Sequence, residues 1–284
     1  MERTLQKSNS ELEIVIDEQL ELLRLSLYVA TQGPTNYNGE LLICDLKEEK
    51  LKVSQMIALG AGQSITTILK CADWKGIPVR DLYPISRSAI ESFINASYVL
   101  VENKNVAERA ARWVKFRAWK QHNRNVGSGK FSLTLSTSPD EPAPPAEFAE
   151  FTEKGQCKEW SELDTASRIR RVGEIAGAKA GSRILAAYAL NYAISSEIIH
   201  GSPFGINYFA QIHTPQNATL DDSIEATVQQ IGDILLQIAH AIAGYLNAFF
   251  KSQKMVASFV TEQLLFNRIL QLQRIDPQTV QDQI

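Results

Sequence analysis

The sequence predicts an all-α protein, a bundle of about seven or eight helices with no significant sheet. Three observations lead to this fold class. Long stretches repeat apolar residues at the helical period, no segment alternates apolar and polar residues as a half-buried strand does, and no internal repeat is visible. With 284 residues and 44% apolar content, the chain is long enough to bury a sizeable core.

The first two helices are defined mainly by their ends. Ser10 precedes an acidic first turn, which suits a helix N-terminus, and Gly33-Pro34 ends that helix. After a loop over 35–45, a second helix is expected from about 47 to 74. Gly60 and Gly62 within it indicate close packing or a bend.

The following helices are predicted in the same way. One spans about 79–102, with Pro84 near the first turn where proline is tolerated. Another spans about 106–124 and is followed by a long glycine- and proline-containing loop. Asp164 or Thr165 caps a helix that ends near 176, with Arg168, Arg170 and Arg171 expected on its exposed face. Helices over 180–200, 220–251 and 256–272 complete the bundle.

The helix over 180–200 carries polar groups on an otherwise apolar surface. At 100° per residue, Tyr192, Ser196 and His200 share one face, while the opposite face is apolar. A helix that is apolar all round is usually buried, so we expect this one at the centre of the bundle. Gly201 and Pro203 end it.

The same polar groups have two interpretations. His200 either caps the last carbonyls of its helix or serves as a general acid or base. Arg87 and Glu91 form either a simple i, i+4 pair or a buried network with the other helix. The functional interpretation is a catalytic or ligand-binding pocket built from Arg87, Glu91, Tyr192, Ser196 and His200. The alternative is a non-catalytic helical scaffold or small-ligand sensor.

Charge is unevenly distributed along the chain. The net charge of −3 combines +7 over residues 103–130 with −10 elsewhere. Cations neutralise phosphates, and interleaved Trp and Phe stack on single-stranded bases, so this stretch predicts RNA contacts by Arg109, Arg112, Arg117, Lys120 and His122. The alternative is a solvated face whose aromatic residues lie in the core and whose charges are matched by the acidic run at 140–147.

Cysteine usage and hydropathy predict a cytoplasmic protein. Cys44, Cys71 and Cys157 are odd in number and lack metal-ligand spacing, so we expect reduced thiols, no metal and no cofactor. The N-terminus lacks a signal-peptide core, and the apolar stretch 234–250 is too short and interrupted to cross a membrane.

The chain divides by its loops into an N-terminal helical segment (1–75), a core helical domain with the polar site (76–252) and a C-terminal helix with its tail (253–284). The long apolar helix over 220–251 is the candidate surface for a homodimer.

Two short motifs carry a resemblance to known families. Arg87-Ser-x-x-Glu91, a Trp- and Arg-rich helix, and Tyr192-x-x-x-Ser196-x-x-x-His200-Gly occur in this order. The order resembles a family of bacterial all-helical proteins of unknown function, over residues of about 75–250. The resemblance implies that these five residues face one another, and it brings no established activity.

A more distant likeness is to the HEPN superfamily, helical domains many of which cut RNA as dimers. Its signature of Arg, four to six residues and His is absent before His200, where Ala193, Ile194 and Ser195 occupy the arginine positions. The signature occurs instead at Arg117 to His122. This likeness implies an RNA-binding or RNA-cleaving domain in stress or phage defence.

Overall fold

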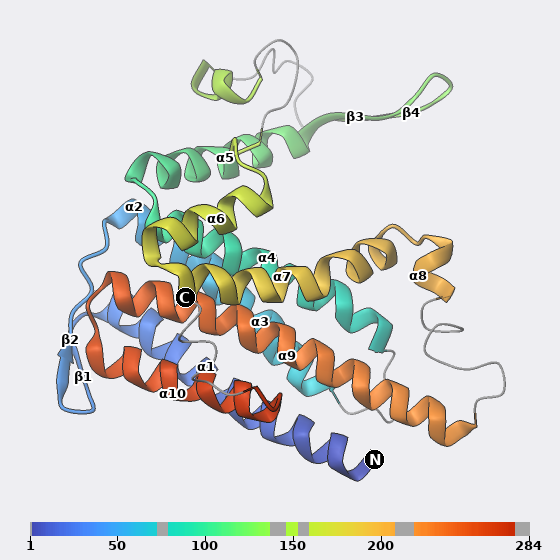
Figure 1. The fold of residues 1–284 in the computed structure, drawn as a ribbon. Coiled ribbons are helices and arrows are strands. Elements are labelled where there is room, and N and C mark those ends of the chain that lie inside the picture. The colour runs from blue at the N-terminus through green and yellow to red at the C-terminus, as the bar shows by residue number, and fades with distance from the viewer. Residues whose placement is uncertain (1, 73–78, 137–145, 153–158, 208–218, 276–284) are drawn as a thin grey trace.

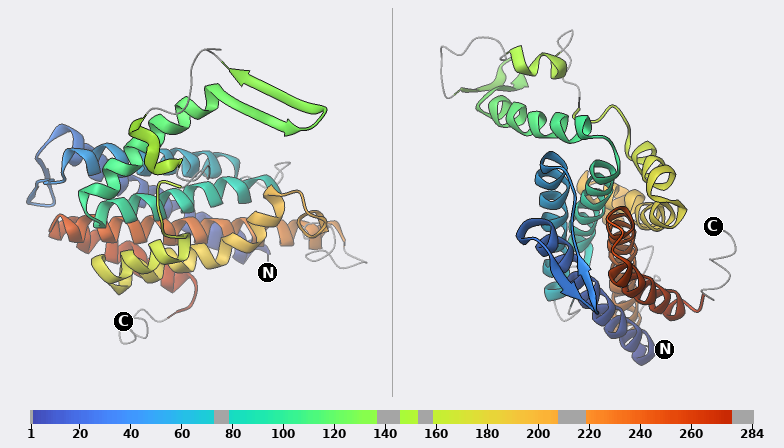
Figure 2. Two further views of the ribbon diagram at one scale, coloured as in Figure 1. Left: turned by 90° about the horizontal axis from the view of Figure 1, so that it is seen from above. Right: turned by 90° about the vertical axis from the view of Figure 1, so that its left-hand side faces the viewer.

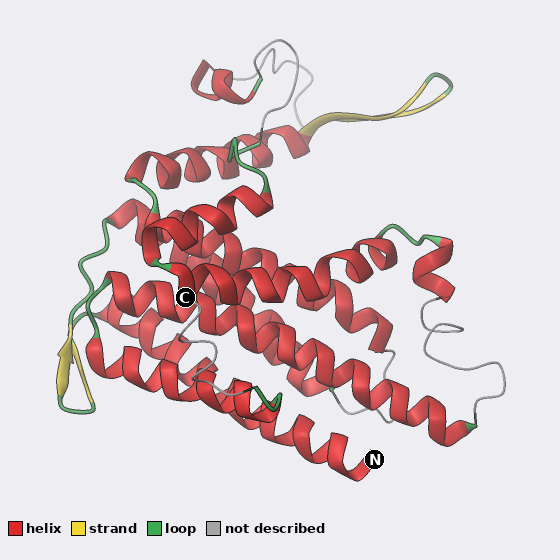
Figure 3. Cartoon of the chain, in the orientation of Figure 1, coloured by secondary structure: helices red, strands yellow, loops and turns green. Residues whose placement is uncertain are grey.

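The protein is a helical bundle in which long helices lie roughly side by side (Figure 1, Figure 3). The computed structural model describes residues 2–72, 79–136, 146–152, 159–207 and 219–275. Ten α-helices occur in these ranges, with two small two-stranded sheets. The all-α prediction is confirmed. The number of helices was underestimated, because α2 (Glu48–Lys50) and α8 (Pro203–Asn207) are too short to show a helical period.

Helix α9 (Leu220–Ser252) is the centre of the bundle. Thr219 begins it with a capping box, in which its hydroxyl accepts the Asp222 N–H while the Asp222 carboxylate accepts the Thr219 N–H. By length and composition α9 could cross a membrane, but 89% of its most apolar window is buried inside the protein. This burial is typical of the core helix of a soluble protein.

Four long helices pack against α9, which lies among them in Figure 1. They are α1 (Glu2–Gln32), α4 (Val79–Val101), α7 (Ala178–Ile199) and α10 (Val256–Leu272), and α3 (Met56–Cys71) packs against α4. One hydrophobic core draws on all of them, from Leu12 to Leu270. The three sequence segments at 1–75, 76–252 and 253–284 therefore all contribute to the same core.

The central position was expected for α7, and this expectation was wrong. Leu185, Leu190 and Ile199 of α7 are about half exposed, because the outer face of the helix has no neighbour among the described residues. Over 234–250 α9 is almost entirely covered by its own chain, while its first turns, from Leu220, are exposed or partly exposed. A homodimer through α9 stays a prediction.

Helices α7, α9 and α10 are joined by a buried ion pair. The Arg183 guanidinium donates to the Glu262 carboxylate, and the two side chains are 5% and 0% exposed. The Asn247 amide donates to the same carboxylate at 3.1 Å. The Arg183 guanidinium also lies 3.7 Å from the ring centroid of Phe266. Gly244 lets α7 approach, because a Cβ there would come within 2.4 Å of Ile184.

A smaller unit lies outside this core (Figure 1, Figure 2). It consists of α5 (Lys104–His122), the hairpin of β3 (Asn123–Ser128) and β4 (Phe131–Ser136), and η2 (Ala146–Phe151). The hairpin projects away from the bundle. Helix α6 (Thr165–Ala176), capped by Asp164 as predicted, packs on α4 and α7.

Neither hairpin was predicted from the sequence. The pair of β1 (Thr35–Tyr37) and β2 (Glu40–Leu42) lies in a segment interpreted as a loop, and three-residue strands are too short to show alternation. The helix expected over 47–74 is divided into α2, the π-helical turn η1 (Leu51–Gln55) and α3. The first helix also begins earlier than predicted, ahead of Ser10.

The buried pair yields a first testable expectation. We expect Arg183→Met to lower the free energy of unfolding by about 3–5 kcal/mol, because Glu262 would remain buried without its partner. The double variant Arg183→Met/Glu262→Leu should recover most of this loss. Arg268→Met, which breaks the exposed α10–α1 pair with Glu18, should cost less than about 1 kcal/mol. Urea unfolding measures all three, and equal losses for Arg183→Met and Arg268→Met would contradict the expectation.

A second expectation concerns acid stability. Burial and, next, the Arg183 guanidinium lower the pKa of His240 to about 4, from the ordinary value of about 6.5. Between these values the unfolded chain binds more protons, so stability falls as the pH is lowered through this window. From pH 7 to 5 the loss through His240 should be about 2 kcal/mol. Urea unfolding of the wild type and of His240→Gln at both pH values checks this; the variant should lose less on acidification.

Candidate functional site

Three of the five residues predicted to form a polar site lie together between α4 and α7. The Arg87 Nε donates to the Glu91 carboxylate at 2.9 Å, and the guanidinium lies 4.6 Å from the ring centroid of Tyr192. The Tyr188 ring packs against that of Tyr192 at a tilt of 35°, with ring centroids 4.8 Å apart. Burial and then the neighbouring Tyr192 raise the pKa of Tyr188. Arg87 therefore links the two helices through a charge pair and a cation–π contact.

The register of α7 against α4 is set by a buried amide. Asn191 Nδ2 donates to the Ser86 hydroxyl at 2.6 Å and to the side-chain Oε1 of Gln237 at 2.7 Å. Because Ser86 and Asn191 directly precede Arg87 and Tyr192 in the sequence, this contact brings the latter two side by side. Asn191 was not among the predicted residues, and it is buried in the structure.

Ser196 and His200 lie further along α7. His200 follows Tyr192 by eight residues, about 12 Å along the axis, and it is exposed at the helix end, where its backbone N–H donates to the Ser196 carbonyl. Among the described residues no hydrogen bond or ion pair joins the His200 side chain to Arg87 or Glu91. The position suits the capping interpretation, and a catalytic role for the five residues stays a prediction.

A pocket of about 500 Å³ adjoins the Arg87–Glu91 pair, and it was not predicted from the sequence. It lies between α4, α5, α6 and the loop before α6. Its lining is rich in carboxylate and indole groups: Glu91, Asn95, Trp113, Glu159, Trp160, Asp164, Thr165 and Arg168. Only Glu91 of these was predicted as a site residue, because the others form no known motif and come from three separate segments of the chain, around 95, 113 and 159–168.

Arg168 is the buried cation of this pocket, at 8% exposure. Its Nε donates to the Leu163 carbonyl at 3.1 Å, and another guanidinium N–H donates to the Asn95 side-chain oxygen. The guanidinium lies 5.4 Å from the ring centroid of Trp160. Burial lowers the pKa of Arg168, an effect opposed chiefly by the charge of Glu159. Arg168 was expected to be exposed, and this expectation is wrong.

Part of the basic helix is neutralised within the described chain. Arg109 pairs with Glu162 at 2.8 Å, and Arg112 pairs with Glu150 at 2.6 Å. The aromatic residues interleaved with them form a small cluster of their own. This cluster contains Trp113, Phe116, Trp119, Phe148 and Phe151. Phe116 is 1% exposed, so its ring is not free to stack on a base.

Other cations of α5 and of its hairpin remain exposed. Lys115, Arg117, Arg124 and Lys130 have no carboxylate of the described residues within ion-pair distance. Arg117 lies 5.6 Å from the Trp113 ring centroid, and Lys120 lies 5.9 Å from that of Phe116. The further counter-charges expected from the acidic run at 140–147 fall mostly outside the described residues. So does the side chain of His122, the last residue of α5.

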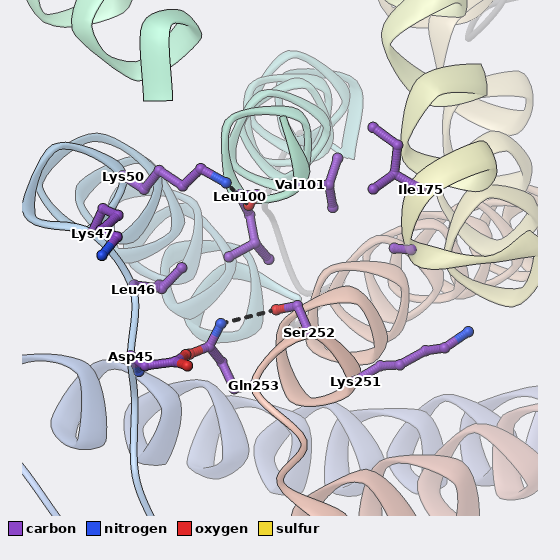
Figure 4. A pocket seen from close by; sticks show the side chains of 11 residues that line it. Asp45, Leu46, Lys47, Lys50, Leu100, Val101, Ile175, Lys251, Ser252 and Gln253 are labelled. Carbon is purple, nitrogen blue, oxygen red and sulfur yellow. Dashed lines mark hydrogen bonds between the residues drawn. The ribbon is translucent and has the colours of Figure 1, made fainter. Parts of the chain in front are cut away.

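A second cavity, of about 410 Å³, lies at the ends of α4, α6 and α9 (Figure 4). Lys47, Lys50 and Lys251 line it. Burial lowers the pKa of Lys50, whose amine donates to the Leu100 carbonyl at 3.0 Å. In Figure 4 the amine of Lys251 points away from that of Lys50. The amines do not converge, so we assign no anion site here.

The described residues also contain no group of three or more side chains arranged to hold a metal ion.

Together these features define a class of protein: an all-α bundle with a polar pocket on one side and a projecting basic unit. The chain belongs to a family of unknown function (DUF5677), which matches residues 74–217, about half of the chain. No curated protein and no solved structure shows a significant match. The matched residues include α4 to α7, and therefore both the pocket and the basic helix. The resemblance to an uncharacterised helical family is confirmed, while the HEPN likeness stays a prediction.

The exposure of the Arg87–Glu91 pair leads to a third expectation. The Glu91 side chain is 38% exposed, so Glu91→Gln should lower the free energy of unfolding by less than about 1 kcal/mol. Glu262→Gln, which neutralises a carboxylate with 0% exposure, should cost several times more. Thermal and urea unfolding of both variants provide the measurement. A loss for Glu91→Gln as large as that for Glu262→Gln would make Glu91 a structural residue.

Proposed function

We propose that this protein binds single-stranded RNA through the outer face of α5 and the β3–β4 hairpin. One observation supports this most directly: Lys115, Arg117, Arg124 and Lys130 are exposed cations without a described acidic partner. The phosphate backbone of a nucleic acid is the natural counter-charge for such a row.

The tip of the hairpin supplies the second part of the argument. Phe131 is 90% exposed and Leu133 is 60% exposed, next to Lys130. An exposed aromatic ring beside cations is the arrangement on which unpaired bases stack. Arg109 and Arg112, which the sequence predicts to contact RNA, are paired with carboxylates. We therefore assign RNA contacts to residues of the hairpin instead.

Binding is proposed here without cleavage. General acid–base chemistry needs a base within hydrogen-bond reach of the reacting proton. His200 lies at the end of α7, about 12 Å along the helix axis from Tyr192, which is the α7 residue that contacts Arg87 of α4. We also place the protein in the cytoplasm, where its cysteines would remain reduced; Cys44 and Cys71 are free thiols.

The fourth expectation tests this surface. The fourfold variant Lys115→Ala/Arg117→Ala/Arg124→Ala/Lys130→Ala should bind a fluorescent oligouridine more weakly. Its log affinity should also depend less on log salt, by about 0.7 for each phosphate that the variant no longer neutralises. Fluorescence anisotropy over a range of KCl concentrations measures both quantities.

A matched control removes the same charge elsewhere. Lys7, Arg24, Lys52 and Lys251 are exposed on other parts of the bundle, and their fourfold alanine variant should keep the salt dependence of the wild type. Phe131→Leu should lower affinity about tenfold while leaving the salt dependence unchanged, because it removes stacking alone. Equal effects of the two fourfold variants, or no binding by the wild type at low salt, would refute the proposal.

A further inference from the structure

The pocket between α4, α5 and α6 combines charges that do not neutralise one another directly. Arg168 is buried in its wall, while Glu91, Glu159 and Asp164 also line it. No carboxylate of the described residues forms an ion pair with Arg168. The pocket therefore holds a cation and several anions that are separated, an arrangement suited to a ligand carrying both charges.

The Arg168 guanidinium has unused hydrogen-bonding capacity. It carries five N–H donors, and its hydrogen bonds go to the Leu163 carbonyl and the Asn95 side-chain oxygen. Both acceptors are neutral, so the cost of burying the charge is only partly offset. A ligand carboxylate would accept two parallel N–H bonds from the guanidinium. The anionic end of a ligand is thus assigned to Arg168.

The carboxylates restrict what else the ligand carries. The Asp164 Oδ1 accepts the Ser167 N–H at 2.7 Å, and the Glu91 Oε1 accepts the Arg87 Nε. Each of these carboxylates retains acceptor capacity, since an ionised carboxylate offers about four lone-pair sites. Three negative charges disfavour a polyanion such as phosphate and favour an ammonium group.

We propose that this pocket binds a free α-amino acid. The carboxylate of the ligand binds Arg168, its ammonium group lies between Glu159 and Asp164, and its side chain packs against Trp113. Trp113 lines the pocket and is only partly buried, so its indole offers an apolar wall. A volume of about 500 Å³ is within the usual range for small-ligand sites. This site does not depend on RNA binding, although both use α5: Arg117 of the proposed RNA surface lies over the Trp113 ring.

The test uses the full chain and ligands that differ by one charge. L-leucine and L-phenylalanine, at about 10 mM or below, are compared with their N-acetyl derivatives, which lack the ammonium, and with their amides, which lack the carboxylate. Isothermal titration calorimetry should give binding of at least one free amino acid, and each derivative should bind at least about tenfold more weakly. Shifts of the Trp113 and Trp160 indole N–H signals in NMR spectra, assigned with Trp→Phe variants, should locate the site.

Variants of the pocket residues test which side chain binds the ammonium group of the ligand and which binds its carboxylate. Glu159 is exposed, so Glu159→Gln should fold normally, weaken the free amino acid roughly tenfold and leave the N-acetyl derivative unchanged. Glu21→Gln, on exposed α1 surface, is the matched control. Arg168→Lys should weaken binding because it loses the planar fork; if it fails to fold, Glu159→Gln still decides. Absence of binding by both amino acids, equal binding of the N-acetyl derivative, or an unchanged affinity in Glu159→Gln would overturn the proposal.

Discussion

The buried ion pair between Arg183 and Glu262 is the constraint on which the arrangement of the long helices depends. Two charges with almost no solvent access are tolerated only with direct pairing and further hydrogen bonds. Asn247 of α9 donates one of these bonds, so the position of α7 against α10 is fixed through the central helix. Apolar packing alone would allow several rotations of α9 over 234–250, where its surface is nearly uniformly apolar. The polar partners distinguish one rotation from the others.

The same principle operates at the other end of α7. The Asn191 amide bonds Ser86 and Gln237 and thereby joins α4, α7 and α9. A one-residue shift of α7 would move Asn191 by 100° around its helix and remove both hydrogen bonds that its amide donates. The Arg87–Tyr192 contact on the surface is a consequence of this register. Arg87 and Tyr192, which the sequence predicts as site residues, are therefore positioned by Ser86 and Asn191, which it does not.

Local signals predicted the helices well. The bounds of α4, α6 and α10 follow from periodicity together with capping or stop residues, and Asp164 caps α6 as expected. The choice of the central helix failed, because α7 and α9 both look apolar all round and only tertiary packing distinguishes them. The pocket could not be predicted at all. In the sequence, Glu159, Asp164 and Arg168 look like ordinary surface residues. Arg168 becomes buried only because Trp160 and Asn95 lie against it.

The basic stretch that includes α5 has two interpretations, an RNA-binding surface and a solvated face with buried aromatic residues, and these do not exclude each other. Residues three apart share a face and residues two apart do not. Trp113 and Phe116 therefore point together into the aromatic cluster, while Lys115 and Arg117 are exposed. The aromatic residues are structural, as the solvated-face interpretation required. Part of the charge is matched, by Glu150 and Glu162, which lie outside the acidic run at 140–147, and the remaining cations have no described partner. A helix of mixed composition can thus hold one wall of a pocket and present an unneutralised face, and its sequence alone does not reveal which cation belongs to which surface.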